Sequence, residues 1–290
     1  MIIPAVLCIT FIHIYPSLDA IRMSFFDISL LRPGSPFIGF GNYIEALSDV
    51  IVRRILLNTL FWSLASLVFG CSFALFVANR LNRPFRGRTV FRTLYLAPWV
   101  TPPIVVAMIW SQVMSRDFSP ISGLLQSMGI IEHSLNFLGD VTLYFGFLSV
   151  PMLSLILINI WGMFPFCMVM FLAALQTIPT DIYEAAQVDG ASKMQQFWRI
   201  TLPMLLPVIQ TTILLQGIWQ FNSFNLSYLI TLGGPLNTTE LMSVRVYTEA
   251  FSHFRYGYGA AISVIMLCVV IVPATFYVLR NARSERAGLN

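Results

Sequence analysis

The chain has 290 residues, of which 57% are hydrophobic and 10% are charged. Soluble domains carry about a quarter of charged residues, so this composition excludes a soluble globular protein and indicates one that crosses a membrane several times. The formal net charge is +4, but the basic residues are not interleaved with aromatic residues on a soluble face, so we expect no nucleic-acid partner.

Six long stretches without charged residues follow one another along the chain. They cover residues 1–18, 55–79, 93–115, 141–180, 200–239 and 256–279. A helix needs about 20 apolar residues to cross the hydrocarbon layer of a membrane. The sequence therefore predicts an all-α, polytopic membrane protein with six transmembrane helices, built as a single integral-membrane domain over residues 1–290. We read the first stretch as a retained helix, because it lacks the basic start and the cleavage site of a signal peptide.

Two of these stretches are too long to be one helix each, so we expect breaks inside them. The helix-breaking residues are Pro151, Gly162, Pro165 and Pro179 in the first stretch, and Gly217, Gly233, Gly234 and Pro235 in the second.

The orientation follows from a short basic loop at residues 80–92, which holds five arginines and no acidic residue. Loops rich in arginine and lysine stay on the cytoplasmic side of a membrane. With six spans, both termini and the polar segment near Glu184 are then cytoplasmic too. The tail residues Arg280, Arg283 and Arg286 support this orientation, whereas Arg53 and Arg54 argue mildly against it.

Several kinds of chemistry lack the residues they need. The four cysteines lie inside predicted spans, the three histidines are scattered, and neither pattern predicts a metal site. The single lysine, Lys193, is not part of a phosphate-binding glycine-rich loop, so we expect no ATP, no other cofactor and no catalytic residue on this chain. The spans between residues 55 and 279 have no charge at their centres, which does not favour a proton- or sodium-coupled carrier.

A polar segment of the chain, residues 177–202, lies between two apolar stretches. Pro179, Thr180 and Asp181 form a helix start, so the segment predicts a first helix over residues 181–189. Gly190 suits the left-handed position that ends a helix, and a second helix is expected from about Ser192.

This segment resembles the cytoplasmic loop of bacterial ABC importer permeases. The matching residues are Glu184, Ala185, Ala186, Gly190, Ile200, Leu202 and Pro203. The resemblance implies a helix-turn-helix whose first helix docks into a cleft of a separate ATPase subunit. It assigns the coupling to Glu184, Ala185, Ala186, Asp189 and Gly190, where the two alanines let another surface approach the helix closely.

Two further segments, at residues 231–235 and 256–261, resemble the carbohydrate-uptake branch of these permeases and, within it, the maltose-type larger half. The resemblance implies an importer for sugars, among them oligosaccharides, in the bacterial cytoplasmic (inner) membrane. It also implies a second homologous permease, two ATPase subunits that bind ATP and Mg, and an extracytoplasmic solute-binding protein. The alternative is a secondary carrier or channel that works alone, in which the Glu184 segment is merely structural.

A sugar site needs amide side chains for the hydroxyls and aromatic rings for the C–H faces. The resemblance places substrate contacts at Trp161, Phe166, Phe221 and Asn222. The spacing of a fifth helix adds a single polar stripe of Gln216, Trp219, Gln220, Ser223 and Ser227. The alternative for this stripe is hydrogen-bonded packing against neighbouring helices.

Overall fold

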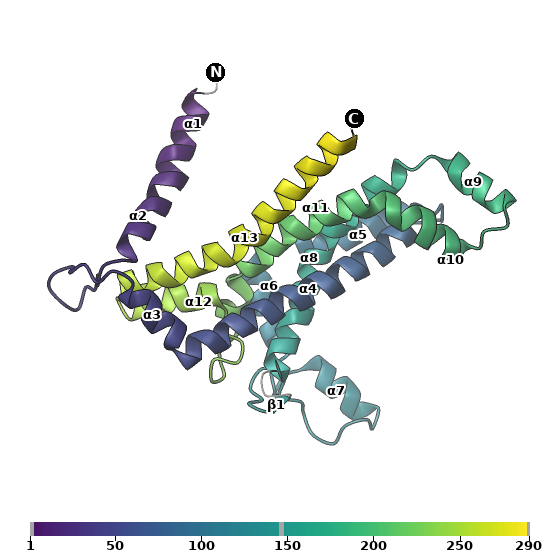
Figure 1. Cartoon of the computed structure of the whole chain (residues 1–290). Coiled ribbons are helices and arrows are strands. Elements are labelled where there is room, and N and C mark those ends of the chain that lie inside the picture. Colours follow the sequence, from purple (N-terminus) through teal and green to yellow (C-terminus); the bar gives the residue numbers. More distant parts are fainter. Residues whose placement is uncertain (1–2, 145–147, 289–290) are drawn as a thin grey trace. The chain divides into compact units, whose positions relative to one another are not determined.

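The computed structural model describes residues 3–144 and 148–288, without the side chains of residue 278 and of residues 280–288. The side chains of Arg280, Arg283 and Arg286 therefore lie outside the described part. Within it, five helices are long and apolar enough to cross a membrane, or up to six if one bent pair counts as a single span (Figure 1). The five are Ile3–Met23, Val50–Asn82, Val150–Gln176, Lys193–Phe221 and Tyr256–Tyr277. The chain is thus a mostly helical, polytopic membrane protein.

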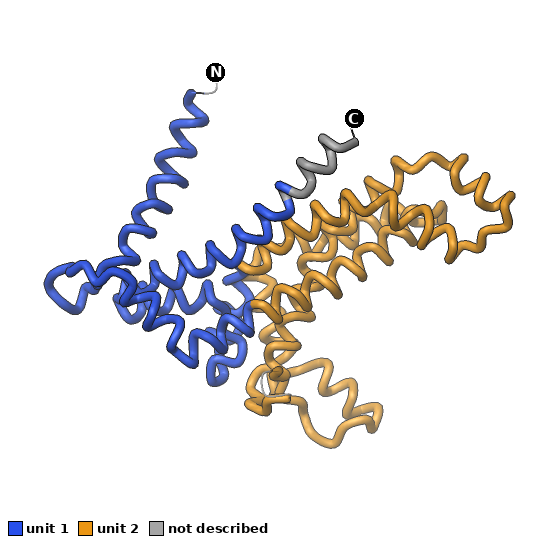
Figure 2. The backbone as a smooth tube through the Cα atoms, viewed as in Figure 1, with its two compact units in different colours: residues 1–59, 222–290 blue, residues 60–221 orange. Residues whose placement is uncertain are grey.

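The chain divides into two compact units (Figure 2). Unit 1 comprises residues 1–59 and 222–290, and unit 2 comprises residues 60–221. The long helix α4, Val50–Asn82, starts in unit 1 and continues in unit 2.

Unit 1 is built on its last helix, α13. Its helices are α1 (Ile3–Ile9), a π-helical segment (Thr10–Ile14), α2 (Tyr15–Met23), α3 (Gly41–Ser48), a second π-helical segment (Ser227–Thr231), α12 (Met242–Tyr247), a third π-helical segment (Thr248–Ser252) and α13 (Tyr256–Gly288). Helix α13 packs against α2, α3 and α12. The side chains of Asp19 and Arg22 form an ion pair at 2.8 Å near the end of the first long helix, Ile3–Met23.

A glycine makes the close packing on α13 possible. The backbone N–H of Gly257 donates to the carbonyl oxygen of Ile28 at 3.1 Å, and a Cβ atom on Gly257 would lie 2.0 Å from the carbonyl oxygen of Phe26. The Asn42 side chain also donates to that oxygen, at 3.0 Å. The Tyr256–Ala261 segment therefore has a packing reason for its first glycine.

Hydrogen bonds to backbone carbonyl groups hold the loop after the second π-helical segment of unit 1. Gly233 has φ +82°, and its N–H donates to the Ser227 carbonyl at 3.2 Å, which ends the helix in the left-handed region. The Asn58 side chain donates to the carbonyl of Asn237 at 3.0 Å, and the Thr239 hydroxyl donates to that of Gly234 at 2.7 Å. The Gly-Gly-Pro sequence thus shapes a loop that is tied to α4.

A charged cluster follows this loop, which we call the Glu249 cluster: Glu45, Asp49, Glu240, Arg245, Glu249, His253 and Arg255. Glu249 is 2% exposed, and its carboxylate lies 2.9 Å from the guanidinium of Arg245 and 3.3 Å from Nδ1 of His253. Arg255 pairs with Glu45 at 2.5 Å. Burial raises the pKa of the Glu240 carboxyl, against the opposing effect of Arg245.

Unit 2 has its core between α4 and α8. Its elements are the rest of α4, then α5 (Arg88–Val100), α6 (Pro103–Val113), α7 (Pro120–Ser127), the antiparallel strands β1 (Leu143–Tyr144) and β2 (Leu148–Ser149), α8 (Val150–Gln176), α9 (Thr180–Val188), α10 (Lys193–Gln196), a π-helical segment (Phe197–Thr201) and α11 (Leu202–Phe221). Gly70 lets α4 approach α8, because a Cβ atom there would meet Met163 at 3.0 Å. The buried Cys71 and Cys167 face each other at 3.9 Å as free thiols.

The expected breaks of the fourth stretch are half right. Pro151 lies in the first turn of α8 and Pro179 immediately precedes α9, so both mark helix ends. The breaks at Gly162 and Pro165 are wrong, because α8 runs through both as one helix. Proline is tolerated inside a membrane helix because neighbouring helices and local adjustments satisfy the backbone groups that it frees.

The stretch at residues 93–115 is a bent pair rather than one straight helix. Helices α5 and α6 meet at 95° across a short break. The break holds Thr101 and Pro102, and α6 begins with Pro103. A proline disfavours the helical conformation in the residue before it, so two successive prolines end α5.

Candidate functional site

The polar segment forms the helix-turn-helix expected from its sequence. Helix α9 covers Thr180–Val188, and Gly190 has φ +79° with open space around its Cα, so its backbone conformation, not crowding, requires glycine. Ser192 caps α10: its hydroxyl accepts from the N–H of Gln195 at 3.3 Å, and the Gln195 side chain accepts from the N–H of Ser192 at 2.8 Å. No side chain caps α9, although Thr180 and Asp181 are at its start.

Helix α9 exposes the residues that are predicted to couple to an ATPase. None of its residues is buried, Val188 is 89% exposed, and Glu184 and Ala185 are exposed as well. The helix is fastened to the following span by the hydroxyls of Tyr183 and Thr201, 2.9 Å apart. An exposed helix with small and apolar residues, held at its base, is a surface that a partner could cover.

Several predicted substrate residues, together with the residues that contact them, fall into two sets with different surroundings. Three amides form the first set, which we call the amide cluster: Asn159, Gln216 and Gln220. They are 9%, 3% and 6% exposed, respectively. Nδ2 of Asn159 donates to Oγ of Ser66 at 2.8 Å and to Oε1 of Gln220 at 2.7 Å.

The remaining bonds of the amide cluster also run inside the protein. Nε2 of Gln220 donates to Oε1 of Gln216 at 3.2 Å and to Sδ of Met163 at 3.4 Å. The amide hydrogens of Asn159 and Gln220 that a sugar hydroxyl would accept are therefore already donated to protein atoms. In this conformation the cluster joins α4, α8 and α11.

The second set is aromatic, with two exposed tryptophans and the half-buried Phe166 between them. We call Trp99, Phe166 and Trp219 the aromatic row: the ring centroids of Trp99 and Phe166 are 6.0 Å apart, and those of Phe166 and Trp219 are 5.2 Å apart. Trp99 is 53% exposed and Trp219 is 52% exposed. Trp161 is 37% exposed, and its ring lies 5.6 Å from that of Trp110. The three tryptophan side chains are thus not covered by the rest of the described chain.

The single stripe predicted on the fifth helix is divided in the structure. Trp219 is exposed, whereas Gln216 and Gln220 are buried, and α11 ends at Phe221. Ser223 and Ser227 follow the end of this helix, and Ser227 begins the next π-helical segment. Phe221 is buried, Asn222 is exposed, and the Ser223 carbonyl accepts from the Ser243 hydroxyl. The assignment of all these residues to a sugar pathway stays a prediction.

Sequence reasoning missed the two tryptophans of the bent pair, Trp99 and Trp110. Trp99 lies three residues before Pro102, and that proximity was the available signal for it, whereas Trp110 lies in the second half of α6. Among residues 3–144 and 148–288, no group of three or more His, Cys, Asp or Glu side chains could hold a metal ion.

The comparisons with known proteins decide the class of this protein. Residues 59–286 match the family described as the inner membrane component of binding-protein-dependent transport systems, which is more than half of the chain. The chain belongs to this family. It is therefore an inner-membrane permease subunit of a transport system that depends on a binding protein, and neither an enzyme nor a stand-alone carrier or channel.

Relatives match along nearly the whole chain. The chain is 31% identical over 294 residues to the trehalose/maltose transport system permease protein MalF of Thermococcus litoralis, with 99% of this chain and 93% of that protein covered. It is 30% identical over 287 residues to the sulfoquinovosyl glycerol transport system permease protein SmoG of Agrobacterium fabrum, with 98% and 90% covered. The same fold occurs in a bacterial ABC transporter involved in the import of the acidic polysaccharide alginate, at a TM-score of 0.80 and 23% identity, with 98% and 94% covered.

Proposed function

We propose that this subunit carries a sugar, and among sugars an oligosaccharide, across the membrane along a path that includes the aromatic row. The observation that carries the proposal is the exposure of Trp99 and Trp219 on either side of Phe166, since ring faces stack on the C–H faces of sugars. The Thermococcus relative belongs to a trehalose/maltose transport system and the Agrobacterium relative to a sulfoquinovosyl glycerol transport system, which supports a sugar as the substrate.

In this proposal, ATP hydrolysis on a partner subunit is coupled to transport through the exposed helix α9. Glu184, Ala185 and Ala186 line it, and Asp189 with Gly190 ends it, so a cleft in a partner could receive the helix backbone closely on its alanine side. The partner is an ATPase subunit, present in two copies, which holds ATP and Mg. A second homologous permease completes the path, and residues 1–290 act as one permease domain.

We propose an orientation in which the coupling segment is cytoplasmic. One pocket is lined both by Asn79 and Arg83, at the end of α4, and by Tyr183 and Lys193, next to the coupling helix. The arginine loop at residues 80–92 and the coupling segment thus share one end of unit 2, and basic loops favour the cytoplasmic side. With the bent pair as one span, the chain crosses six times and both termini are cytoplasmic.

The test of coupling uses the whole transporter, reconstituted with its ATPase, second permease and binding protein. Replacing Gly190 by Val or Glu184 by Lys should abolish ATP hydrolysis stimulated by the loaded binding protein, because the left-handed turn or the charge match is lost. Glu132→Lys is the matched control, since Glu132 is also an exposed acid but lies in the loop before α8. Normal stimulation in both loop variants would refute the coupling role.

A further inference from the structure

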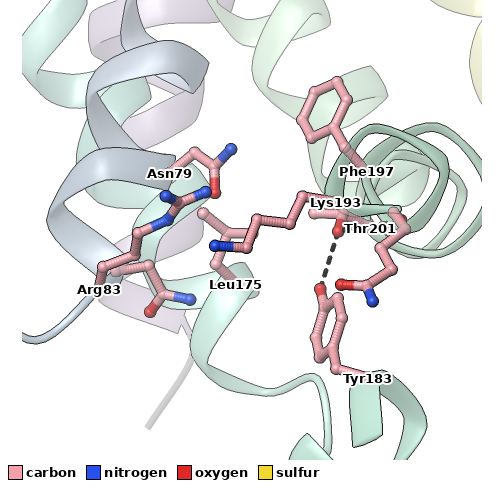
Figure 3. Close-up of a pocket in the computed structure, with 9 residues that line it drawn as sticks. Asn79, Arg83, Leu175, Tyr183, Lys193, Phe197 and Thr201 are labelled. Atoms are coloured by element: carbon pink, nitrogen blue, oxygen red, sulfur yellow. Dashed lines mark hydrogen bonds between the residues drawn. The ribbon is translucent and has the colours of Figure 1, made fainter. Parts of the chain in front are cut away.

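A pocket of about 320 Å³ lies beside the coupling helix, at the end of α4 (Figure 3). It is lined by Asn79, Asn82, Arg83, Leu175, Tyr183, Lys193, Gln196, Phe197 and Thr201. This volume falls in the range of small-molecule sites, about 300–1,000 Å³. Among the lining residues there are two cations and several amides and hydroxyls, but no Asp or Glu.

The two cations face the same space without an internal counter-ion. Figure 3 shows the Lys193 side chain reaching across the pocket toward Arg83 and Asn79. Among the described residues, no hydrogen bond or ion pair occupies the side chains of Arg83 or Lys193, whereas Tyr183 and Thr201 bond to each other at 2.9 Å. Two like charges aimed at one cavity repel each other, so an anion bound between them would be stabilised.

An apolar groove opens from this pocket and shares four of its residues: Asn79, Arg83, Lys193 and Phe197. The groove measures about 460 Å³ and is otherwise lined by Ser72, Leu75, Phe76, Met194 and Trp198. Phe76 is 57% exposed, Met194 66% and Trp198 60%. Ser72, Leu75, Phe76 and Asn79 lie on one face of α4 at helical spacing, so the groove runs along a membrane-spanning helix.

We propose that pocket and groove together bind one anionic phospholipid, with the phosphodiester headgroup between Arg83 and Lys193 and an acyl chain along Phe76 and Trp198. A polar, basic pocket joined to an apolar groove on a membrane helix matches the two halves of a lipid. A free phosphate would leave the groove empty, and a soluble acidic protein would not reach along the span. Basic pockets between membrane helices on the cytoplasmic side are suited to such headgroups.

The inference goes beyond the proposed function, because it holds whatever sugar is carried. It has a consequence for coupling, since Tyr183 is part of α9 and Lys193 begins α10. A lipid held there would brace the base of the coupling helix, so the anionic lipid content of the membrane would tune the ATPase response.

Native mass spectrometry of the full chain tests the proposal, with phosphatidylglycerol, phosphatidylcholine and inorganic phosphate as separate probes. Phosphatidylglycerol should bind in preference to phosphatidylcholine, and Lys193→Gln and Arg83→Gln should each weaken it about fivefold, the factor for one basic residue near an anionic surface. Lys193→Arg should keep the binding. Arg86→Gln is the matched control, because Arg86 is an exposed arginine of the same loop outside the pocket.

A groove variant separates lipid from free anion. Trp198→Gln should weaken both lipids equally, because it removes apolar lining and leaves both cations in place. Equal binding of the two lipids, displacement of phosphatidylglycerol by millimolar inorganic phosphate, or loss of the lipid when the whole transporter assembles would each overturn the proposal. None of these binding measurements depends on transport, so a result that overturns the lipid site leaves the proposed sugar transport untouched.

Discussion

The amide cluster makes a prediction about stability that separates packing from substrate binding. Asn159→Ala removes a donor that reaches Ser66 at 2.8 Å and Gln220 at 2.7 Å. A hydrogen bond between membrane helices contributes about 0.6 kcal/mol on average and at most about 1.7. Two lost bonds, with two acceptors left buried, should destabilise the protein by about 1–3 kcal/mol.

The two buried cysteines provide the assay. Cys71 and Cys167 are buried, so a thiol-reactive dye reaches them when the helices separate, once the exposed Cys8 and Cys268 are replaced by Ser. Labelling against temperature or denaturant then gives the change in unfolding free energy.

A second variant tests whether the loss comes from unpaired polar groups. The double variant Asn159→Leu with Gln220→Leu should recover part of the stability lost by Asn159→Ala, because apolar groups of similar size replace both partners. If Asn159→Ala leaves stability within about 0.3 kcal/mol of the parent and instead changes the ratio of sugars carried, the amides bind substrate and our interpretation fails.

Three further predictions concern other parts of the chain. Gly257→Ala should lower the free energy of unfolding by about 1–3 kcal/mol or more, since its Cβ would lie 2.0 Å from the Phe26 carbonyl oxygen. Gly162→Ala, which has open space around it, should leave stability unchanged or raise it in the same thermal unfolding assay. Burial raises the pKa of Glu240, so the folded chain holds that proton more tightly than the unfolded one. Stability should then fall as the pH rises from the ordinary value of 4.5 toward the raised one, and Glu240→Gln should flatten this slope in unfolding midpoints measured across the acidic range. Trp219→Ala should lower uptake of every sugar in an oligosaccharide panel while Trp219→Phe retains most of it, and a change confined to one sugar would contradict the stacking role.

Local signals in the sequence were sufficient for the coupling segment. The helix before Gly190 and the capped helix after Ser192 depend on neighbouring residues, so their positions were predicted to within a residue or two. The number of apolar stretches likewise indicated the membrane spans, because hydropathy is a property of the segment itself.

The structure differed where tertiary surroundings override a local signal. Pro165 looked like a break, but α8 continues because its neighbours cover it on most sides. The polar stripe assumed a helix through Ser227, yet α11 ends at Phe221, just before Asn222 and Ser223. Asparagine and serine are disfavoured inside helices, because side chains of these types can compete for backbone hydrogen bonds. Which face of α11 is buried depends on α4 and α8, and spacing within one helix carries no information on that.

The Glu249 cluster bears on how this permease responds to its medium. Salt screens exposed charges over about 8–10 Å at physiological ionic strength, but it screens buried pairs much less. Glu249 is 2% exposed and the Arg245 side chain 15%, so their pair keeps its strength when the ionic strength of the surrounding solution rises or falls. The pair of Arg255 and Glu45, with side chains 40% and 51% exposed, is screened more. A rise in salt concentration would then weaken the exposed pair of Arg255 and Glu45 first and leave the buried pair of Arg245 and Glu249 intact.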